Sequence, residues 1–114
     1  MKETIKAIKI EPGKRAKIVH VENELEALQK EVGGYLEAVT IADDMCVLCD
    51  EEGWWKNAKY NCCIDGVYYR GTVLVVGVDG EEFADIPFRS EMMMRIAQAD
   101  KGSYKRMRFG EGVV

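Results

Sequence analysis

Residues 71–78 read Gly-Thr-Val-Leu-Val-Val-Gly-Val and contain an unbroken apolar run from Val73 to Val76. Consecutive apolar residues, most of them β-branched, are typical of a strand that is buried on both faces. Such a strand lies in the interior of a sheet, with packing layers on each side. The stretch therefore predicts a central strand, and the rest of the chain must supply its neighbours and its cover.

Strand-like segments separated by turns lie on both sides of this run. Thr4–Ile10 and Ala16–Glu22 are rich in β-branched residues, and the turn residues Glu11-Pro12-Gly13-Lys14 join them, so the pair predicts a hairpin. Short connections of this kind join antiparallel strands. Further strands are predicted at Tyr35–Ile41, Met45–Cys49 and Glu82–Ile86, with turns at Asp65-Gly66 and Asp79-Gly80, and residues 54–63 are expected to form a loop that packs its aromatic side chains.

Asn23–Val32 is predicted to be a helix. Asn23 is a favoured N-cap residue, and Glu26 three positions later completes a pattern typical of a capping box. Gly33, followed by Gly34, suits the left-handed conformation in which many helices end. The apolar stripe expected to face the sheet consists of Leu25, Leu28 and Val32.

A second helix is predicted over Glu91–Ala99, which has Met93, Ile96 and Ala97 on one side. Together these elements predict an α+β fold. The fold is a mainly antiparallel sheet of about five or six strands, with one helix packed on a face and a second, C-terminal helix. We expect one domain over residues 1–114, with residues 101–114 as a basic tail.

The composition limits the classes of function. The chain has 114 residues, of which 47% are hydrophobic and 32% charged, as expected for a globular protein. Its net charge of −4 argues against a protein built around DNA phosphates. The chain has no apolar run long enough to span a membrane, and its charged start does not resemble a signal peptide. We therefore expect a cytoplasmic protein without a membrane partner.

The four cysteines could be read as zinc ligands, because Cys46 and Cys49 form a C-x-x-C pair and Cys62 and Cys63 follow. However, Met45–Cys49 is predicted to be a strand, in which residues three apart point to opposite faces. No glycine or proline lies within the pair to form the turn of a zinc site. The favoured interpretation is therefore four buried thiols, no metal and no cofactor, with zinc as the alternative.

No arrangement of residues points to catalysis. His20 is the single histidine and lies within a predicted strand. The acidic groups at Asp43-Asp44 and Asp50–Glu52 follow strands, where carboxylates usually are solvated turn residues. Gly33-Gly34 follows a helix rather than preceding one, so it does not offer the N–H groups that bind phosphate. The sequence therefore favours a binding protein over an enzyme.

Two features point to contact surfaces. Trp54 and Trp55 are adjacent in a predicted loop, so we expect one to pack on the core and the other to be exposed. Exposed tryptophans are common at partner surfaces and also stack on bases. Between residues 101 and 109 four cations alternate with two aromatic residues, a weak nucleic-acid signature whose alternative is a solvated end of the chain.

Several segments together resemble a family of small domains of unknown function in phages, prophages and other mobile elements. The resemblance rests on Glu11–Lys14, on Leu28–Glu37 with its Val-Gly-Gly helix exit, on Asp50–Gly53 and on the Gly-Thr strand at residues 71–77. It covers roughly residues 5–88. It departs from the family pattern where Asp50 replaces Asn, where Cys62 follows Asn61 in place of Arg, and where Trp54-Trp55 replaces a polar stretch.

The resemblance implies an accessory protein of a mobile element that binds a host protein or a nucleotide-like ligand and so antagonises host defence. The alternative is a nucleic-acid-associated regulatory protein that uses the basic tail. Because loops held by a rigid sheet often carry function, we expect the site at the helix exit and in the loop after Asp50. Arg70 at the edge of the apolar run could contact a ligand there, or could pair with Glu37 or Glu51. The predicted binding residues are Tyr35, Glu37, Trp54, Trp55, Asn61 and Arg70.

Overall fold

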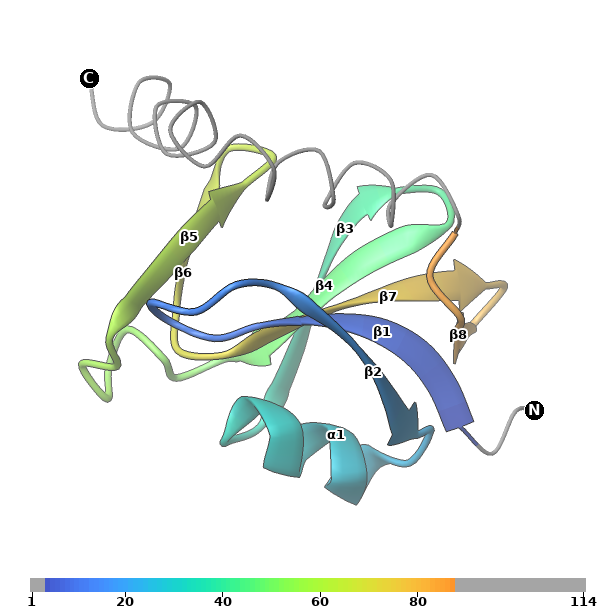
Figure 1. The fold of residues 1–114 in the computed structure, drawn as a ribbon, viewed down its shortest axis with the longest axis horizontal. Coiled ribbons are helices and arrows are strands. Elements are labelled where there is room, and N and C mark those ends of the chain that lie inside the picture. The colour runs from blue at the N-terminus through green and yellow to red at the C-terminus, as the bar shows by residue number, and fades with distance from the viewer. Residues whose placement is uncertain (1–3, 88–114) are drawn as a thin grey trace.

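The structure is a computed structural model that describes residues 4–87 (Figure 1). The predicted second helix and the basic tail lie outside these residues. In the described part no helix is long and apolar enough to cross a membrane. The elements, in chain order, are β1 (Thr4–Ile10), β2 (Lys17–Glu22), α1 (Leu25–Val32), β3 (Leu36–Ala42), β4 (Met45–Asp50), β5 (Tyr60–Ile64), β6 (Val67–Arg70), β7 (Val73–Asp79) and β8 (Glu82–Ala84).

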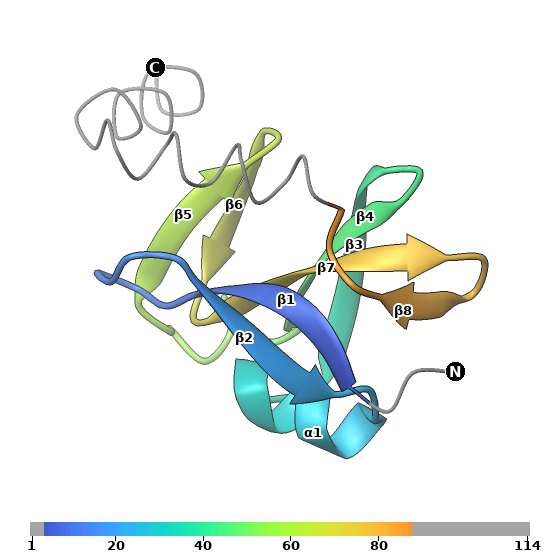
Figure 2. The same cartoon turned by 45° about the vertical axis from the view of Figure 1, so that its right-hand side comes forward.

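The main sheet is antiparallel and has six strands in the described residues, in the order β2-β1-β7-β4-β3, with β8 also paired to β7. β7 is central, as its apolar run predicts. One edge of β7 pairs with β4, and the other edge pairs first with β1 at Val73–Val75 and then with β8 at Gly77–Asp79. Figure 2 shows β1 and β8 following one another along this side of β7. A strand enclosed by three others has little backbone left to hydrogen-bond with water, which suits its apolar sequence.

Asp85 and Ile86, which follow β8, bond to β1 where the pairing of β7 passes from β1 to β8. The Lys6 N–H of β1 donates to a carboxylate oxygen of Asp85 at 2.8 Å, and the Ile86 N–H donates to the Lys6 carbonyl at 2.9 Å. The Asp85 carbonyl lies against Gly77, where a Cβ atom would overlap its oxygen. Gly77 is therefore required because backbone from two segments meets there.

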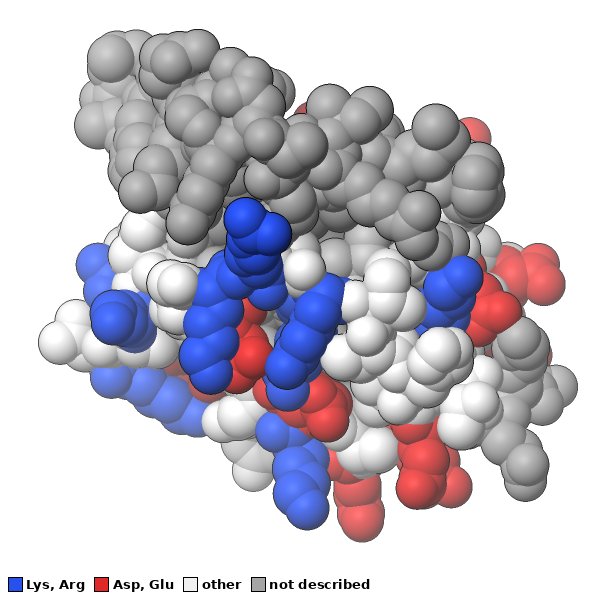
Figure 3. Space-filling view, viewed as in Figure 1, with Lys and Arg blue, Asp and Glu red and all other residues white. Residues whose placement is uncertain are grey.

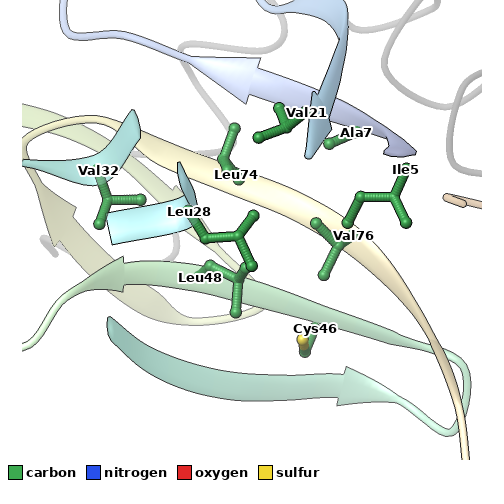
Figure 4. Close-up of a cluster of buried hydrophobic side chains, with 9 residues drawn as sticks. All are labelled: Ile5, Ala7, Val21, Leu28, Val32, Cys46, Leu48, Leu74 and Val76. Atoms are coloured by element: carbon green, nitrogen blue, oxygen red, sulfur yellow. The ribbon is translucent and has the colours of Figure 1, made fainter. Parts of the chain in front are cut away.

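The core has two layers, one on each face of the sheet. The alternation of side chains along a strand decides which layer each residue joins, so Cys46 and Cys49 fall on opposite faces, as predicted. Figure 4 shows the layer covered by α1, in which Leu28 and Val32 pack toward Leu48 and Leu74. The opposite layer contains Ile8, Ile10, Val47, Cys49, Cys62, Tyr69, Val73, Val75 and Ile86.

The second layer is covered by a hairpin whose turn the sequence predicted but whose first strand it did not. Residues 54–63 were expected to be a loop, but Tyr60–Ile64 form β5, which pairs with β6 in a separate two-stranded sheet. The turn between them is the predicted Asp65-Gly66, and both residues have positive φ (51° and 81°). Gly71, with φ 80°, then separates β6 from β7. The hairpin packs Cys62 and Tyr69 onto the sheet, and this tertiary burial stabilises a segment with no clear strand periodicity.

The helix differs from its prediction at the start and agrees with it at the end. It begins at Leu25, with Glu24 at the N-cap and no side-chain cap. Asn23 instead donates its side-chain amide to the Phe83 carbonyl at 3.1 Å, which ties the helix start to β8. Leu25 is 61% exposed, so the buried stripe consists of Leu28 and Val32. Gly33 has φ 85° and ends the helix in the left-handed conformation, as predicted.

Candidate functional site

The segment after β4 is held in place by Asp50. One carboxylate oxygen of Asp50 accepts the Glu52 N–H at 2.9 Å, and the other accepts the Lys56 ammonium at 2.9 Å. Lys56 also donates to the Gly33 carbonyl at 3.2 Å, and its hydrogen bond to Asp50 raises the pKa of Lys56. Asp50 thus joins the helix exit to the turn that follows β4. An aspartate that begins a turn by accepting a nearby N–H is recognisable in sequence, but the partner Lys56 is not.

Two glycines allow these segments to approach one another. A Cβ atom on Gly34 would lie 2.5 Å from the carboxyl carbon of Asp50, and a Cβ on Gly53 would lie 2.9 Å from the Arg70 carbonyl oxygen. The Glu51 N–H donates to the Tyr35 carbonyl at 2.9 Å. The helix exit, the turn at residues 50–53 and the end of β6 are therefore packed directly together.

Both tryptophans lie on the surface of this assembly. Trp54 is 58% exposed and Trp55 is 89% exposed, so the expectation that one packs on the core is wrong. Residues 54 and 55 lie in the turn segment 51–57 that follows β4, outside the strands of the sheet. The guanidinium carbon of Arg70 lies 4.4 Å from the centre of the Trp54 ring, within the range of a cation–π contact.

Arg70 is held by neighbours other than those expected. Its guanidinium donates to the Ala58 carbonyl at 2.9 Å and lies 3.5 Å from the Asn57 side-chain oxygen. Within residues 4–87 its contacts are thus with the 54–58 segment rather than with Glu37 or Glu51. Arg70 therefore fixes the position of the Trp54 ring.

The remaining predicted residues are divided between surface and interior. Tyr35 is 64% exposed and adjoins the tryptophan turn through its carbonyl, whereas Glu37 is exposed on β3. Asn61 is 4% exposed and lies beneath the surface. Its side-chain amide donates to the carbonyls of Ile10 and Gly71, both at 2.8 Å, which ties β5 to β1 and to the start of β7. We refer to Tyr35, Trp54, Trp55 and Arg70 as the aromatic surface.

Charged side chains of both signs are interleaved on the face seen in Figure 3. Glu11 lies 3.8 Å from the Lys14 ammonium and 3.5 Å from that of Lys17, and Lys9 lies 2.8 Å from Glu31. Pairs of this kind cancel the field that steers phosphate backbones. The described part of this face therefore does not resemble a continuous basic surface for nucleic acid.

The cysteines are free and buried, and residues 4–87 contain no group of three metal-ligating side chains. Burial raises the pKa of Cys46 to about 11. Burial also raises the pKa of Cys49 to about 11, and the charges of Glu37 and Asp50 add to the effect. The Cys49 thiol donates to the Glu37 carbonyl at 3.7 Å. Both thiols are therefore neutral and weakly reactive near neutral pH.

We expect native Cys46 and Cys49 to react with a thiol reagent at pH 8 about 100-fold more slowly than after unfolding, because a rise of about two units in pKa lowers the thiolate fraction about 100-fold. Mass mapping of alkylated peptides before and after adding guanidinium measures this. Equal labelling of both thiols in the folded and unfolded protein would contradict the described burial.

The same shift in pKa predicts how stability depends on pH. The unfolded thiols ionise near pH 9 and the folded thiols near pH 11, so the free energy of unfolding should fall as the pH rises from 9 to 11.

The model of one protein family matches residues 5–97, which is most of the chain. The chain belongs to the domain of unknown function DUF3846. No curated protein and no solved structure matches it significantly. The DUF3846 match includes the whole aromatic surface and Asn61, and it carries no assigned activity. Functional inference for this DUF3846 domain therefore rests on its own surface.

Proposed function

We propose that this DUF3846 domain is a non-catalytic protein-binding module that contacts its partner through the aromatic surface. The observation that carries the proposal is the exposure of Trp55, at 89%, next to Trp54 with the Arg70 guanidinium on its ring. Large exposed aromatic side chains are costly to leave in water, and Trp, Tyr and Arg are the residue types enriched at the energetic centres of protein interfaces.

The exposure of Trp55 also bears on the class of partner. Small ligands bind in concave sites that bury most of their surface. A side chain that is 89% exposed projects from the protein and cannot form the floor of such a site. A projecting tryptophan is better suited to enter a pocket on a macromolecule, which favours a host protein over a nucleotide-like ligand. We further propose, from the resemblance of its sequence motifs to those of mobile-element proteins, that this host protein belongs to a defence system.

The surface is preorganised for this role. Asp50 and Lys56 hold the turn, and Arg70 restrains Trp54, so less side-chain freedom is lost when a partner binds. Leu25 on α1 supplies a matched control, because it is 61% exposed but belongs to a different element.

We expect Trp55→Ala to weaken binding of the partner by about 30-fold, as at an interface hot spot, while changing the free energy of unfolding by less than about 0.5 kcal/mol. The full-length wild type, Trp55→Ala and Leu25→Ala are immobilised, and proteins retained from a host lysate are compared by quantitative mass spectrometry. Binding of each retained protein is then measured with purified components. The proposal requires a partner that is kept by Leu25→Ala and lost by Trp55→Ala.

If Trp55→Ala retains the same proteins as wild type, the aromatic surface is not the contact site. A labelled single-stranded RNA or DNA oligonucleotide tests the alternative function. Binding that falls steeply with salt and disappears when residues 101–114 are deleted would replace the proposal with a nucleic-acid-associated role.

A further inference from the structure

β3 forms one edge of the main sheet and is unusually poor in charge for an edge strand. It pairs with β4 alone among the described strands. Its sequence, Leu-Glu-Ala-Val-Thr-Ile-Ala, contains Glu37 as its single charged residue. Natural edge strands are usually protected from pairing with other strands by charged side chains, especially lysine, or by proline. The opposite edge, β2, follows that rule with the charged residues Lys17 and Glu22 among six residues.

The hydrogen-bonding pattern identifies which backbone groups of β3 face outward. The Glu51 N–H donates to the Tyr35 carbonyl, so the pairs Tyr35–Glu51 and Glu37–Cys49 are the hydrogen-bonded ones. The N–H and C=O groups of Leu36, Ala38 and Thr40 therefore point away from β4, and no other described strand pairs with them. The irregular register of β3 lies between Thr40 and Ala42, after these three residues. Within residues 4–87, a regular edge from Leu36 to Thr40 is thus left for a further strand.

We propose that β3 pairs with β3 of a second copy of the chain, in antiparallel orientation about Ala38. In this register Ala38 faces the partner copy's Ala38, and Leu36 faces Thr40. Glu37 faces Val39, so the single charge does not meet its own copy.

A second copy fits this edge for reasons of symmetry and charge. A two-fold axis through Ala38 gives a closed, isologous contact that uses the same residues on both chains. Self-pairing in this register places no like charges opposite each other, and all outward N–H and C=O groups between Leu36 and Thr40 find partners. The inference does not depend on the aromatic surface having a partner, because purified protein alone tests it.

The register predicts a charge-swap result. Ala38 is exposed, so lysine or glutamate fits in the monomer, but two copies of either would place like charges directly opposite each other. We expect wild type to sediment as a dimer, at twice the 12.9 kDa of one chain. Ala38→Lys and Ala38→Glu should each dimerise at least about tenfold more weakly, and an equimolar mixture of the two should dimerise again.

Two controls separate pairing from folding. His20→Glu alters an exposed residue at the opposite edge and should leave the wild-type dimer unchanged, and Trp55→Ala should do the same. Circular dichroism confirms that each variant is folded. Hydrogen exchange of Leu36, Ala38 and Thr40 amides in wild type should slow as protein concentration rises. A wild type that remains monomeric at several hundred micromolar, or single Ala38 variants that dimerise like wild type, would overturn the proposal.

Discussion

Gly77→Ala is expected to lower the free energy of unfolding by about 3 kcal/mol, because the added methyl group meets backbone that cannot rotate away. A Cβ atom at this position would overlap the Asp85 carbonyl oxygen, and it would lie 2.8 Å from the Asp85 carbonyl carbon and 3.1 Å from the Ala84 carbonyl oxygen. Gly77 also pairs with Met45 on its other side, so the strand has no free direction in which to move.

The expected loss of stability is opposite in sign to the effect of an ordinary glycine-to-alanine substitution in a strand. Alanine within a strand normally stabilises relative to glycine by about 0.5–1 kcal/mol. Gly80→Ala in the next turn is the control, since its Cβ meets nothing within 4 Å and its φ of 65° should cost only about 1–2 kcal/mol. Urea unfolding followed by circular dichroism compares the two. If Gly77→Ala is as stable as wild type, β8 and Asp85 do not lie against β7 as described.

Asn61→Asp is expected to destabilise the protein by about 3–4 kcal/mol at pH 7, because it exchanges a donor for an acceptor at a buried site. The Asn61 amide donates to the carbonyls of Ile10 and Gly71 at 2.8 Å, and the introduced carboxylate would face both carbonyl oxygens with no proton to share. Because these bonds hold β5 against β1 and β7, we expect the β5–β6 hairpin to loosen first.

The loss of stability in Asn61→Asp should depend on pH in a defined direction. Burial among carbonyl oxygens raises the pKa of the introduced carboxyl group above its value of about 4 in the unfolded chain. Folding therefore favours its protonated form, and the deficit should be largest at neutral pH and smaller as the pH falls toward 4. Protonation restores one donor, so recovery should be partial.

Asn23→Asp is a matched control for this substitution. Asn23 is half-buried and donates a single side-chain bond, to the Phe83 carbonyl at 3.1 Å, so its replacement should cost about 1 kcal/mol. Thermal melts of both variants at pH 4 and pH 7 provide the comparison. Equal losses for the two variants, or no pH dependence for Asn61→Asp, would show that the buried amide does not have the role assigned to it.

The candidate site was predicted from the sequence only in part. Tyr35, Trp54 and Arg70 were predicted from the sequence; the structure brings Trp54 and Arg70 into contact, and the Tyr35 carbonyl accepts the Glu51 N–H of the same turn segment. Asn61 was selected with them but is an interior hydrogen-bond donor. A polar residue in an irregular segment is usually solvated, and only the packing of the β5–β6 hairpin reveals that it is buried.

The local elements of this protein follow from short stretches of neighbouring residues. The apolar run at Val73–Val76 specifies a strand buried on both faces, and Gly33 specifies the end of α1, because strand periodicity and left-handed φ are properties of neighbouring residues. Long-range packing determines that Tyr60–Ile64 form a strand, that Asn61 lies inside and that both tryptophans, rather than one, are exposed. These outcomes depend on contacts between distant segments, such as those of Asn61 with Ile10 and of Lys56 with Gly33, and contacts of that range leave no periodic trace in the sequence.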